Sequence, residues 1–490
     1  MKILKKVALI IALITTGGCA KDFLEVSPRG DLTLDKFFKT EEHALLATNA
    51  VYSILRRWEV HTFAYVGVTD ILSDDADKGS EPNDAAFLSD IDNLTFDAGN
   101  IAPLTVWQGY YTAIYRANLA IENIPSCQMN EILRGRLVAE CKFLRGYFYF
   151  NLVRWFGNVP LITKPLTADE FKQARVSKDL IYAQIVKDMT EAIAVLPEKS
   201  QYASDDLGRV TKGAAKGMLA KVYLTLKDYP NAEKTALEVL NSTEYDLTTD
   251  YTNIFTREGE NGRESLFEVQ CTNNSDLNNG GSQFNEIQGT RGSPDNGWGF
   301  NRPSDSFISE FEPGDPRRDA TILYEGEVFP DGSDILAKNP NVFNARYNQK
   351  AWVPRVAGRL NGVGQGNIRI LRFADVVLIA AEALNENGKT APALTQLNAV
   401  RKRARGGANG ILPDVKETDK VKLRTAIWHE RRVEMGMEQQ RWFDLVRTGQ
   451  VEAAMKKHGK NNVSAKHLLL PIPQKEIDLS GQTLTQNLGY

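Results

Sequence analysis

The chain has 490 residues, a formal net charge of −3, and 42% hydrophobic and 25% charged residues. This length is long for one compact core and predicts two or three substructures that share a boundary. The charge gives no basic excess, so nothing points to a nucleic-acid partner. No apolar run after the first residues reaches the roughly 20 residues that cross a bilayer.

The first 18 residues have the pattern of a secretory signal peptide, with a basic start, a short apolar run over 7–14 and small residues after it. Cys19 follows directly, so the segment resembles the lipobox of bacterial lipoproteins. That resemblance implies a Cys19 that carries acyl chains such as palmitate, a tether over 19–30 and a body held at a membrane. The alternative is an ordinary secreted protein with a cysteine near its cleavage site.

Three cysteines remain, at 127, 141 and 271. An odd number cannot all pair within one chain. Cys127 and Cys141 lie on adjacent predicted helices and are a candidate disulfide, but buried free thiols are the favoured prediction. No cluster of cysteine or histidine has the spacing of metal ligands, and no cofactor is predicted.

Helical signals dominate residues 31–241. Thr40, followed by Glu41 and Glu42, has the composition of a helix start. Apolar periodicity predicts the further helices 104–125, 131–156, 178–196, 211–226 and 230–241.

Residues 58–102 interrupt this pattern and are rich in Asp, Asn, Gly and aromatic residues. Long loops between helices tend to be functional or disordered. Asp74, Asp75 and Asp77 raise the question of calcium. They lack the ligand alternation and terminal Glu of an EF-hand, so a solvated acidic turn is favoured.

Two helix pairs share a pattern of small residues. In one pair, Ala220 is followed by Ala232 and Ala236. In the other pair, Ala381 is followed by Ala393 at the same offset that separates Ala220 from Ala232. Small residues let antiparallel helices approach closely, as in tetratricopeptide repeats. The pattern predicts a helical-repeat scaffold.

Residues 242–370 are predicted to be a loop-rich insertion with a short strand near 265–270, and residues 371–490 to form a C-terminal helical part. The periodicity of that last part predicts helices over 372–386, 391–405, 419–436 and 438–448.

Several blocks resemble motifs of the SusD/RagB family, in family order along the whole chain. Residues 370–386 resemble the helix "RxADVLLxxAEALNE", and residues 441–449 resemble "RWFDLxRxG". Further similar blocks lie at 19–28, 397–404, 427–434, 470–477 and 486–490, where Leu488 replaces the family's Pro.

The resemblance implies a mainly α fold with a tetratricopeptide-like superhelical scaffold and a loop-rich ligand-binding portion with a few short strands. It also implies an outer-membrane lipoprotein that faces the cell surface beside a SusC-like TonB-dependent transporter. Members of the family bind nutrients, most often oligosaccharides or polysaccharides, and do no chemistry. The sequence itself shows no nucleophile elbow, metal spacing or phosphate loop.

The charged residues inside these blocks are predicted to hold helices together rather than to bind ligand, because their spacing suits interhelical ion pairs. They are Asp375, Glu382, Glu430, Arg431, Arg432 and Asp444.

Ligand contacts are predicted where the helical pattern fails, since a sugar needs a flat aromatic ring beneath it and polar groups at its edge. Two stretches, 58–84 and 284–302, offer both. The candidate contacts are Trp58, Tyr65, Asp74, Asp75, Arg291, Asn296, Trp298, Phe300 and Asn301. For any single aromatic, packing within its own loop is an equal alternative.

The leading hypothesis is a surface glycan-binding subunit of an uptake complex. A peptide- or protein-capturing member of the same family and a periplasmic tetratricopeptide scaffold lipoprotein are the alternatives.

Overall fold

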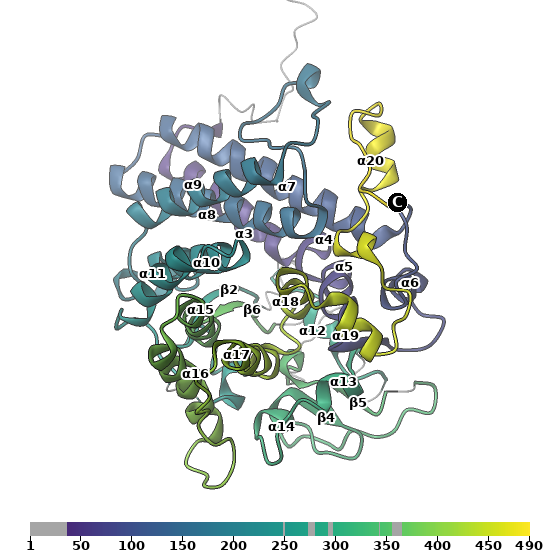
Figure 1. The fold of residues 1–490 in the computed structure, drawn as a ribbon. Helices are drawn as coiled ribbons and strands as arrows, with labels where there is room; N and C mark the ends of the chain where they lie inside the picture. The colour runs from purple at the N-terminus through teal and green to yellow at the C-terminus, as the bar shows by residue number, and fades with distance from the viewer. Residues whose placement is uncertain (1–36, 248–249, 273–279, 293–296, 343, 355–364) are drawn as a thin grey trace, which may run out of the picture.

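The computed structural model describes residues 37–247, 250–272, 280–292, 297–342, 344–354 and 365–490 (Figure 1). The chain is mostly helical with a few short strands, which confirms the predicted fold class. The predicted signal peptide, Cys19 and the tether lie outside the described residues. Among the helices formed by described residues, none combines the length and the apolar character needed to cross a membrane.

The N-terminal helices surround one central helix, α8 (Glu131–Phe156), which is capped by the Asn130 side chain. From Leu137 onward almost all of its residues are buried, because several other helices of this part pack against it. The other long helices of this part are α3 (Glu41–Ser53), α7 (Ile101–Asn123), α9 (Lys178–Val195), α10 (Lys212–Thr225) and α11 (Tyr229–Leu240).

The prediction that residues 58–102 form a long loop is wrong for most of residues 58–92. The segment folds into short helices and a strand: α4 (Trp58–His61), α5 (Phe63–Val66), a π-helix η3 (Gly67–Ile71), β1 (Ala76–Gly79) and α6 (Ala86–Asp92). Every residue from Val60 to Asp75 is buried. Helices of four or five residues are too short to show a helical period in sequence.

The two predicted repeat pairs pack as expected. Helix α10 lies against α11, and α15 (Phe373–Glu386) lies against α16 (Thr390–Arg405). The alanines of the pattern are fully buried between the paired helices. The helical C-terminal part continues with α17 (Lys420–Met435), α18 (Arg441–Thr448), α19 (Val451–Lys457) and α20 (Gln474–Leu479).

In the part of the chain that the structure describes, the strands form three two-stranded antiparallel sheets. They pair β1 with β3 (Phe300–Pro303), β2 (Ser265–Val269) with β6 (Ile368–Arg372), and β4 (Ile322–Tyr324) with β5 (Arg346–Asn348). The predicted strand near 265–270 is β2. The three-part division of the chain stays a prediction, and β1 pairs with β3 across its first internal boundary.

Shorter elements make up the rest of the secondary structure in the described residues. Between residues 242 and 370 the described α-helices are α12 (Phe284–Gln288), α13 (Asp305–Ile308) and α14 (Arg317–Thr321). The 3-10 turns are η2 (Ile54–Arg56), η4 (Ile124–Ser126), η5 (Ala168–Glu170), η6 (Lys199–Gln201), η7 (Ser204–Asp206), η8 (Thr252–Phe255), η9 (Gln349–Ala351) and η10 (Ala465–Leu468).

Buried ion pairs join the C-terminal helices, as predicted for the charged residues of the family blocks. Arg431 bridges Asp375 and Asp444, at 2.5 and 2.7 Å. Arg447 pairs with Glu382 at 2.6 Å. The remaining pairs follow the same principle, with Glu430 held by Arg317 and Arg401, and Arg432 by Asp74, Asp75 and Glu310.

Cys127, Cys141 and Cys271 are buried free thiols. The favoured prediction is therefore confirmed, and the candidate disulfide between Cys127 and Cys141 is not formed. Burial raises the pKa of Cys141 and of Cys271 to about 12, so both remain protonated at neutral pH.

Candidate functional site

Two tryptophans from the two predicted ligand stretches meet at the surface. The ring centroids of Trp58 and Trp298 lie 6.0 Å apart, although 240 residues separate them in sequence. Phe63 packs behind both rings, at 5.2 and 5.7 Å. Trp58 is 37% exposed and Trp298 is half-buried. The pair therefore offers aromatic surface to solvent on a rigid aromatic base.

Helix α4 places Trp58 at the surface because its other end is anchored inside the protein. The Nδ1–H group of His61 donates to the Leu55 carbonyl at 2.8 Å, and Nε2 accepts from the Tyr147 hydroxyl at 2.6 Å. Burial lowers the pKa of His61 to about 4, so the ring is neutral at neutral pH. The Thr62 hydroxyl donates to the Trp58 carbonyl at 2.5 Å and fixes the turn between α4 and α5.

Backbone hydrogen bonds hold Trp298 from both sides. Its N–H donates to the Glu286 carbonyl at 2.9 Å, and its carbonyl accepts from the Ser80 hydroxyl at 2.7 Å. Gly299 follows with φ +76°, a left-handed conformation that suits glycine. The chain then enters β3, which pairs with β1. The ring is thus presented by a turn fixed to the 58–84 segment.

A cavity of about 620 Å³ opens beside Trp58, a size typical of ligand pockets. Most of its lining is polar, and three guanidinium groups contribute to it. The lining residues are Ser53, Arg56, Arg57, Trp58, Glu59, Thr62, Arg116, Gly281, Ser282 and Gln283. We call it the Trp58 cavity.

A second cavity of about 720 Å³ adjoins the first, since Arg57 and Glu59 line both. Helix α7 contributes Trp107 and Tyr111, and the segment after η5 contributes Phe171, which is 67% exposed. Helix α20 closes the other side with Leu479. We call this the α7–α20 groove.

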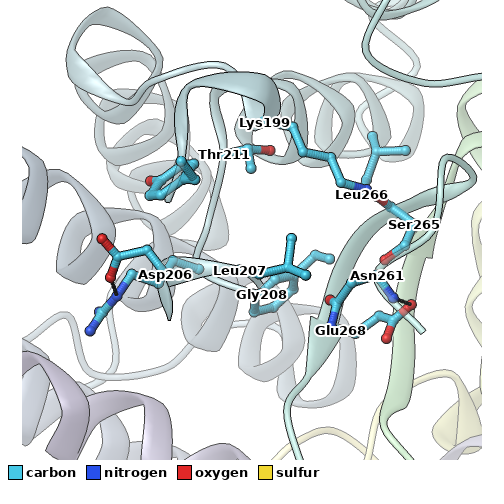
Figure 2. Close-up of a pocket in the computed structure, with 12 residues that line it drawn as sticks. Lys199, Asp206, Leu207, Gly208, Thr211, Asn261, Ser265, Leu266 and Glu268 are labelled. Carbon is cyan, nitrogen blue, oxygen red and sulfur yellow. Dashed lines mark hydrogen bonds and ion pairs between the residues drawn. The ribbon is translucent and has the colours of Figure 1, made fainter. Parts of the chain in front are cut away.

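A further pocket, between η6 and β2, holds only about 20 Å³, roughly the room for one water (Figure 2). Lys199 crosses it and donates to the carbonyls of Gly262 and Ser265, at 2.6 and 3.0 Å. Burial lowers the pKa of Lys199 to about 8. The contacts tie two elements together and leave no room for a sugar.

The structure places predicted contacts Asp74 and Asp75 in the interior, where arginines of the C-terminal part hold them. Arg441 donates to Asp74 at 2.7 Å, and Arg432 donates to Asp75 at 2.8 Å. Although burial opposes ionisation, the two arginines lower the pKa of Asp74 to about 2. These residues form neither the expected solvated turn nor a surface for ligand.

Tyr65, Phe300 and Asn301 are also buried, at 4%, 4% and 0% exposure. The Asn301 side chain donates to Asp70 and Gln288, at 3.1 and 2.7 Å. All three predicted contacts are therefore interior residues of the protein.

Arg291 is half-buried and pairs with Glu81 and Asp84, each at 3.1 Å. Its charge is neutralised within the protein. Asn296, the remaining predicted contact, lies outside the described residues.

Sequence reasoning missed the polar wall of the Trp58 cavity. Arg56 and Arg57 precede Trp58 directly, so a window opened two residues earlier would have included them. Arg116 and Gln283 come from α7 and from the residues before α12, and no local signal marks them. Among the described residues, no group of three His, Cys, Asp or Glu side chains lies together as a metal site would require.

Comparison with known proteins decides the family. The model described as "SusD family" matches residues 263–490, and the model "Starch-binding associating with outer membrane" matches residues 22–224. A solved structure named "Laminarin binding SusD-like protein" is 31% identical, covers 92% of this chain and 100% of its own, and has a TM-score of 0.79. The chain belongs to the SusD family.

Other relatives are similar to this SusD-family chain over nearly its whole length. SusD-like protein P2 of Formosa agariphila is 28% identical over 99% of both chains. Surface glycan-binding protein A of Bacteroides thetaiotaomicron, solved in complex with laminarihexaose, is 26% identical over 92% of this chain and 100% of its own, with a TM-score of 0.77.

Proposed function

We propose that this SusD-family protein captures oligosaccharides at the cell surface, with Trp58 and Trp298 as the aromatic platform. The observation that carries the proposal is the contact between Trp58 and the half-buried Trp298, with the exposed Trp58 lining the polar Trp58 cavity. Solved relatives named for laminarin and laminarihexaose binding support it. The protein is proposed to bind and not to catalyse.

The geometry suits a sugar ring. One face of a pyranose is apolar and packs on an aromatic ring, while its hydroxyl groups need hydrogen-bond partners at the rim. Trp58 offers the aromatic ring on which the apolar face of the sugar packs. The Gln283 amide, the Glu59 carboxylate and the neighbouring guanidinium groups line the cavity beside it and offer donors and acceptors.

The proposal further assigns acylation to Cys19, anchorage in the outer membrane and delivery to a SusC-like TonB-dependent transporter. Support comes from the lipobox-like sequence and from the family model for outer-membrane association. Replacing Cys19 by Ala should release the protein from the membrane fraction. Retention of the variant in that fraction would disprove the anchor.

The binding test uses the protein from residue 20 onward, which retains every described residue. We expect saturable binding in a glycan array and in calorimetry, weakened at least tenfold by Trp58→Ala and by Trp298→Ala, a loss of about 1.4 kcal/mol. Trp428→Ala on α17 is the matched control and should bind as the unmodified protein does.

The two alternatives predict different results. A peptide-capturing family member would bind peptides and no carbohydrate in the same assays. A periplasmic scaffold would survive protease treatment of intact cells, whereas a surface protein is digested.

A further inference from the structure

Three arginines line the Trp58 cavity and outnumber its acidic groups. Arg56, Arg57 and Arg116 contribute guanidinium groups, and Glu59 is the one carboxylate among the described lining residues. Glu59 lies 3.4 Å from Arg57, and both side chains are exposed, which makes this a weak pair. The cavity wall therefore carries a net positive charge close to +2.

The other two arginines have no carboxylate partner within 4.0 Å among the described residues. Nη1 of Arg56 donates to the Gly280 carbonyl at 2.8 Å, and Nη1 of Arg116 donates to the Ala50 carbonyl at 3.0 Å. These bonds fix each guanidinium group by one edge. Their Nη2 groups have no hydrogen-bond partner among the described residues, so donors remain for a ligand.

This arrangement contrasts with that of the buried arginines elsewhere in the molecule. Arg317 and Arg372 each lie against three carboxylates. Burial lowers the pKa of Arg116, and the nearby positive charge of Arg57 acts in the same direction. A bound anion would offset these positive charges.

We infer that the ligand is an anionic glycan, whose carboxylate or sulfate group enters the Trp58 cavity while a sugar face packs on Trp58 and Trp298. Guanidinium groups bind carboxylate and sulfate oxygens through paired N–H donors, and they do so best in a partly enclosed site. The inference rests on the proposed function and adds the chemical class of the substrate.

The experiment compares matched oligosaccharides by calorimetry on the protein from residue 20 onward. One arm uses uronate-containing oligosaccharides and their carboxyl-reduced forms, and a second uses sulfated oligosaccharides and their desulfated forms. Neutral laminarihexaose is the common reference. We expect one anionic arm to bind at least tenfold more tightly than its neutral form, and the arm that does so identifies the acid.

Variants then locate the charge effect. Arg56→Gln and Arg116→Gln should each weaken anionic binding at least tenfold and weaken neutral binding by a much smaller factor, because Gln keeps an N–H donor for a sugar hydroxyl and loses only the charge. Arg318→Gln, an exposed arginine on α14 that pairs with Asp319, is the matched control and should change neither. Raising the salt concentration should weaken only the anionic complexes.

Equal affinity for charged and neutral forms would overturn the anionic inference and leave glycan binding intact. Absence of binding to every carbohydrate would overturn the proposed function itself. If an anionic form binds more tightly but the two Gln variants do not weaken it, the cavity assignment is wrong.

Discussion

His61 shows how one buried side chain supports the exposed end of α4. It ends the same four-residue helix that begins with Trp58, and both ring nitrogens are bonded inside the protein. The tautomer is fixed, because Nδ1 must donate to a carbonyl and Nε2 must accept from a hydroxyl. A proton on Nε2 would place a donor against the Tyr147 oxygen and a charge in the core.

This arrangement predicts an acid-sensitive stability. The pKa of His61 is lowered to about 4 in the folded state from an ordinary 6.5, because burial disfavours the charged ring. The folded state therefore binds the proton less tightly than the unfolded state. The contribution of neutral His61 to the free energy of unfolding is complete above pH 6.5. It is lost as the pH falls to about 4, and the total loss is about 3 kcal/mol.

Thermal and urea unfolding between pH 7 and pH 4 measure this effect. Between pH 7 and pH 4, the free energy of unfolding of His61→Gln should fall by about 3 kcal/mol less than that of the unmodified protein. His467, whose pKa is also lowered to about 4, contributes equally to both proteins. Parallel profiles for the two proteins, or an NMR titration of His61 near pH 6.5, would contradict the assignment.

Composition alone did not separate candidate residues at the surface from candidates in the interior. Trp58 and Trp298 were predicted from aromatic residues in irregular segments, and they meet at the surface. Asp74 and Asp75 satisfied the same rule but are buried against Arg441 and Arg432, more than 350 residues away. A local pattern cannot reveal a partner at that separation, so surface and interior acids look alike in sequence.

At the scale of elements, the position of Trp58 depends on a close contact between two helices. A Cβ atom at Gly109 of α7 would lie 2.4 Å from the Glu59 carbonyl oxygen and 2.6 Å from the Glu59 Cβ. The backbone of α4 passes so near that only glycine fits. The contact sets the distance between α4 and α7 and therefore the exposure of the Trp58 indole ring.

Gly109→Ala should therefore displace α4, destabilise the protein by about 1–3 kcal/mol and weaken glycan binding several-fold. Gly135→Ala on α8 is the matched control. Its Cβ would meet Val195 at an ordinary 3.4 Å, and the better helix propensity of alanine should stabilise the protein by up to about 1 kcal/mol. Unfolding midpoints and calorimetry on both variants test this, and identical behaviour would refute the role of the contact.

A second element-scale feature is the buried ion network that joins β6 to α17. Arg372 lies against Glu264, Glu434 and Glu438, at 2.5, 3.2 and 2.7 Å, and all four side chains are nearly inaccessible. Such a network adds little net stability over apolar packing, but removal of one partner leaves the others buried without compensation.

Arg372→Met removes the central charge at similar volume and should cost about 3–5 kcal/mol. Lys456→Met removes an exposed lysine that pairs with Glu452 one helical turn away and should cost less than about 1 kcal/mol. Denaturant unfolding measures both changes. Equal losses would mean that the network is not energetically distinct from surface pairs.

For the whole molecule, strongly periodic segments were the predictable part. Helix α8 and the pairs α10–α11 and α15–α16 appear where apolar and small-residue spacing placed them. The segment from α4 to η3 escaped prediction, because its elements have four or five residues each. Their helical form depends on burial between α7 and the C-terminal part, which only the complete fold provides.

The same long-range contacts predict that the chain folds as one unit, although separate family models match residues 22–224 and 263–490. Strand β1 of the first region pairs with β3 of the second. The Asp74–Arg441 and Asp75–Arg432 pairs cross the same boundary. The Leu470 N–H donates to the Trp155 carbonyl at 2.7 Å, which ties the last segment to α8.

Each region expressed alone would leave buried charges without partners, and each broken pair costs about 3–5 kcal/mol, so neither fragment should fold. We expect near-UV circular dichroism without fixed tertiary signals and rapid proteolysis for both. The control is the full chain cleaved at a protease site inserted after the exposed Gly332, which keeps every one of these contacts and should remain folded and bind glycan. A stable, protease-resistant fragment 263–490 would show that the two regions are independent domains.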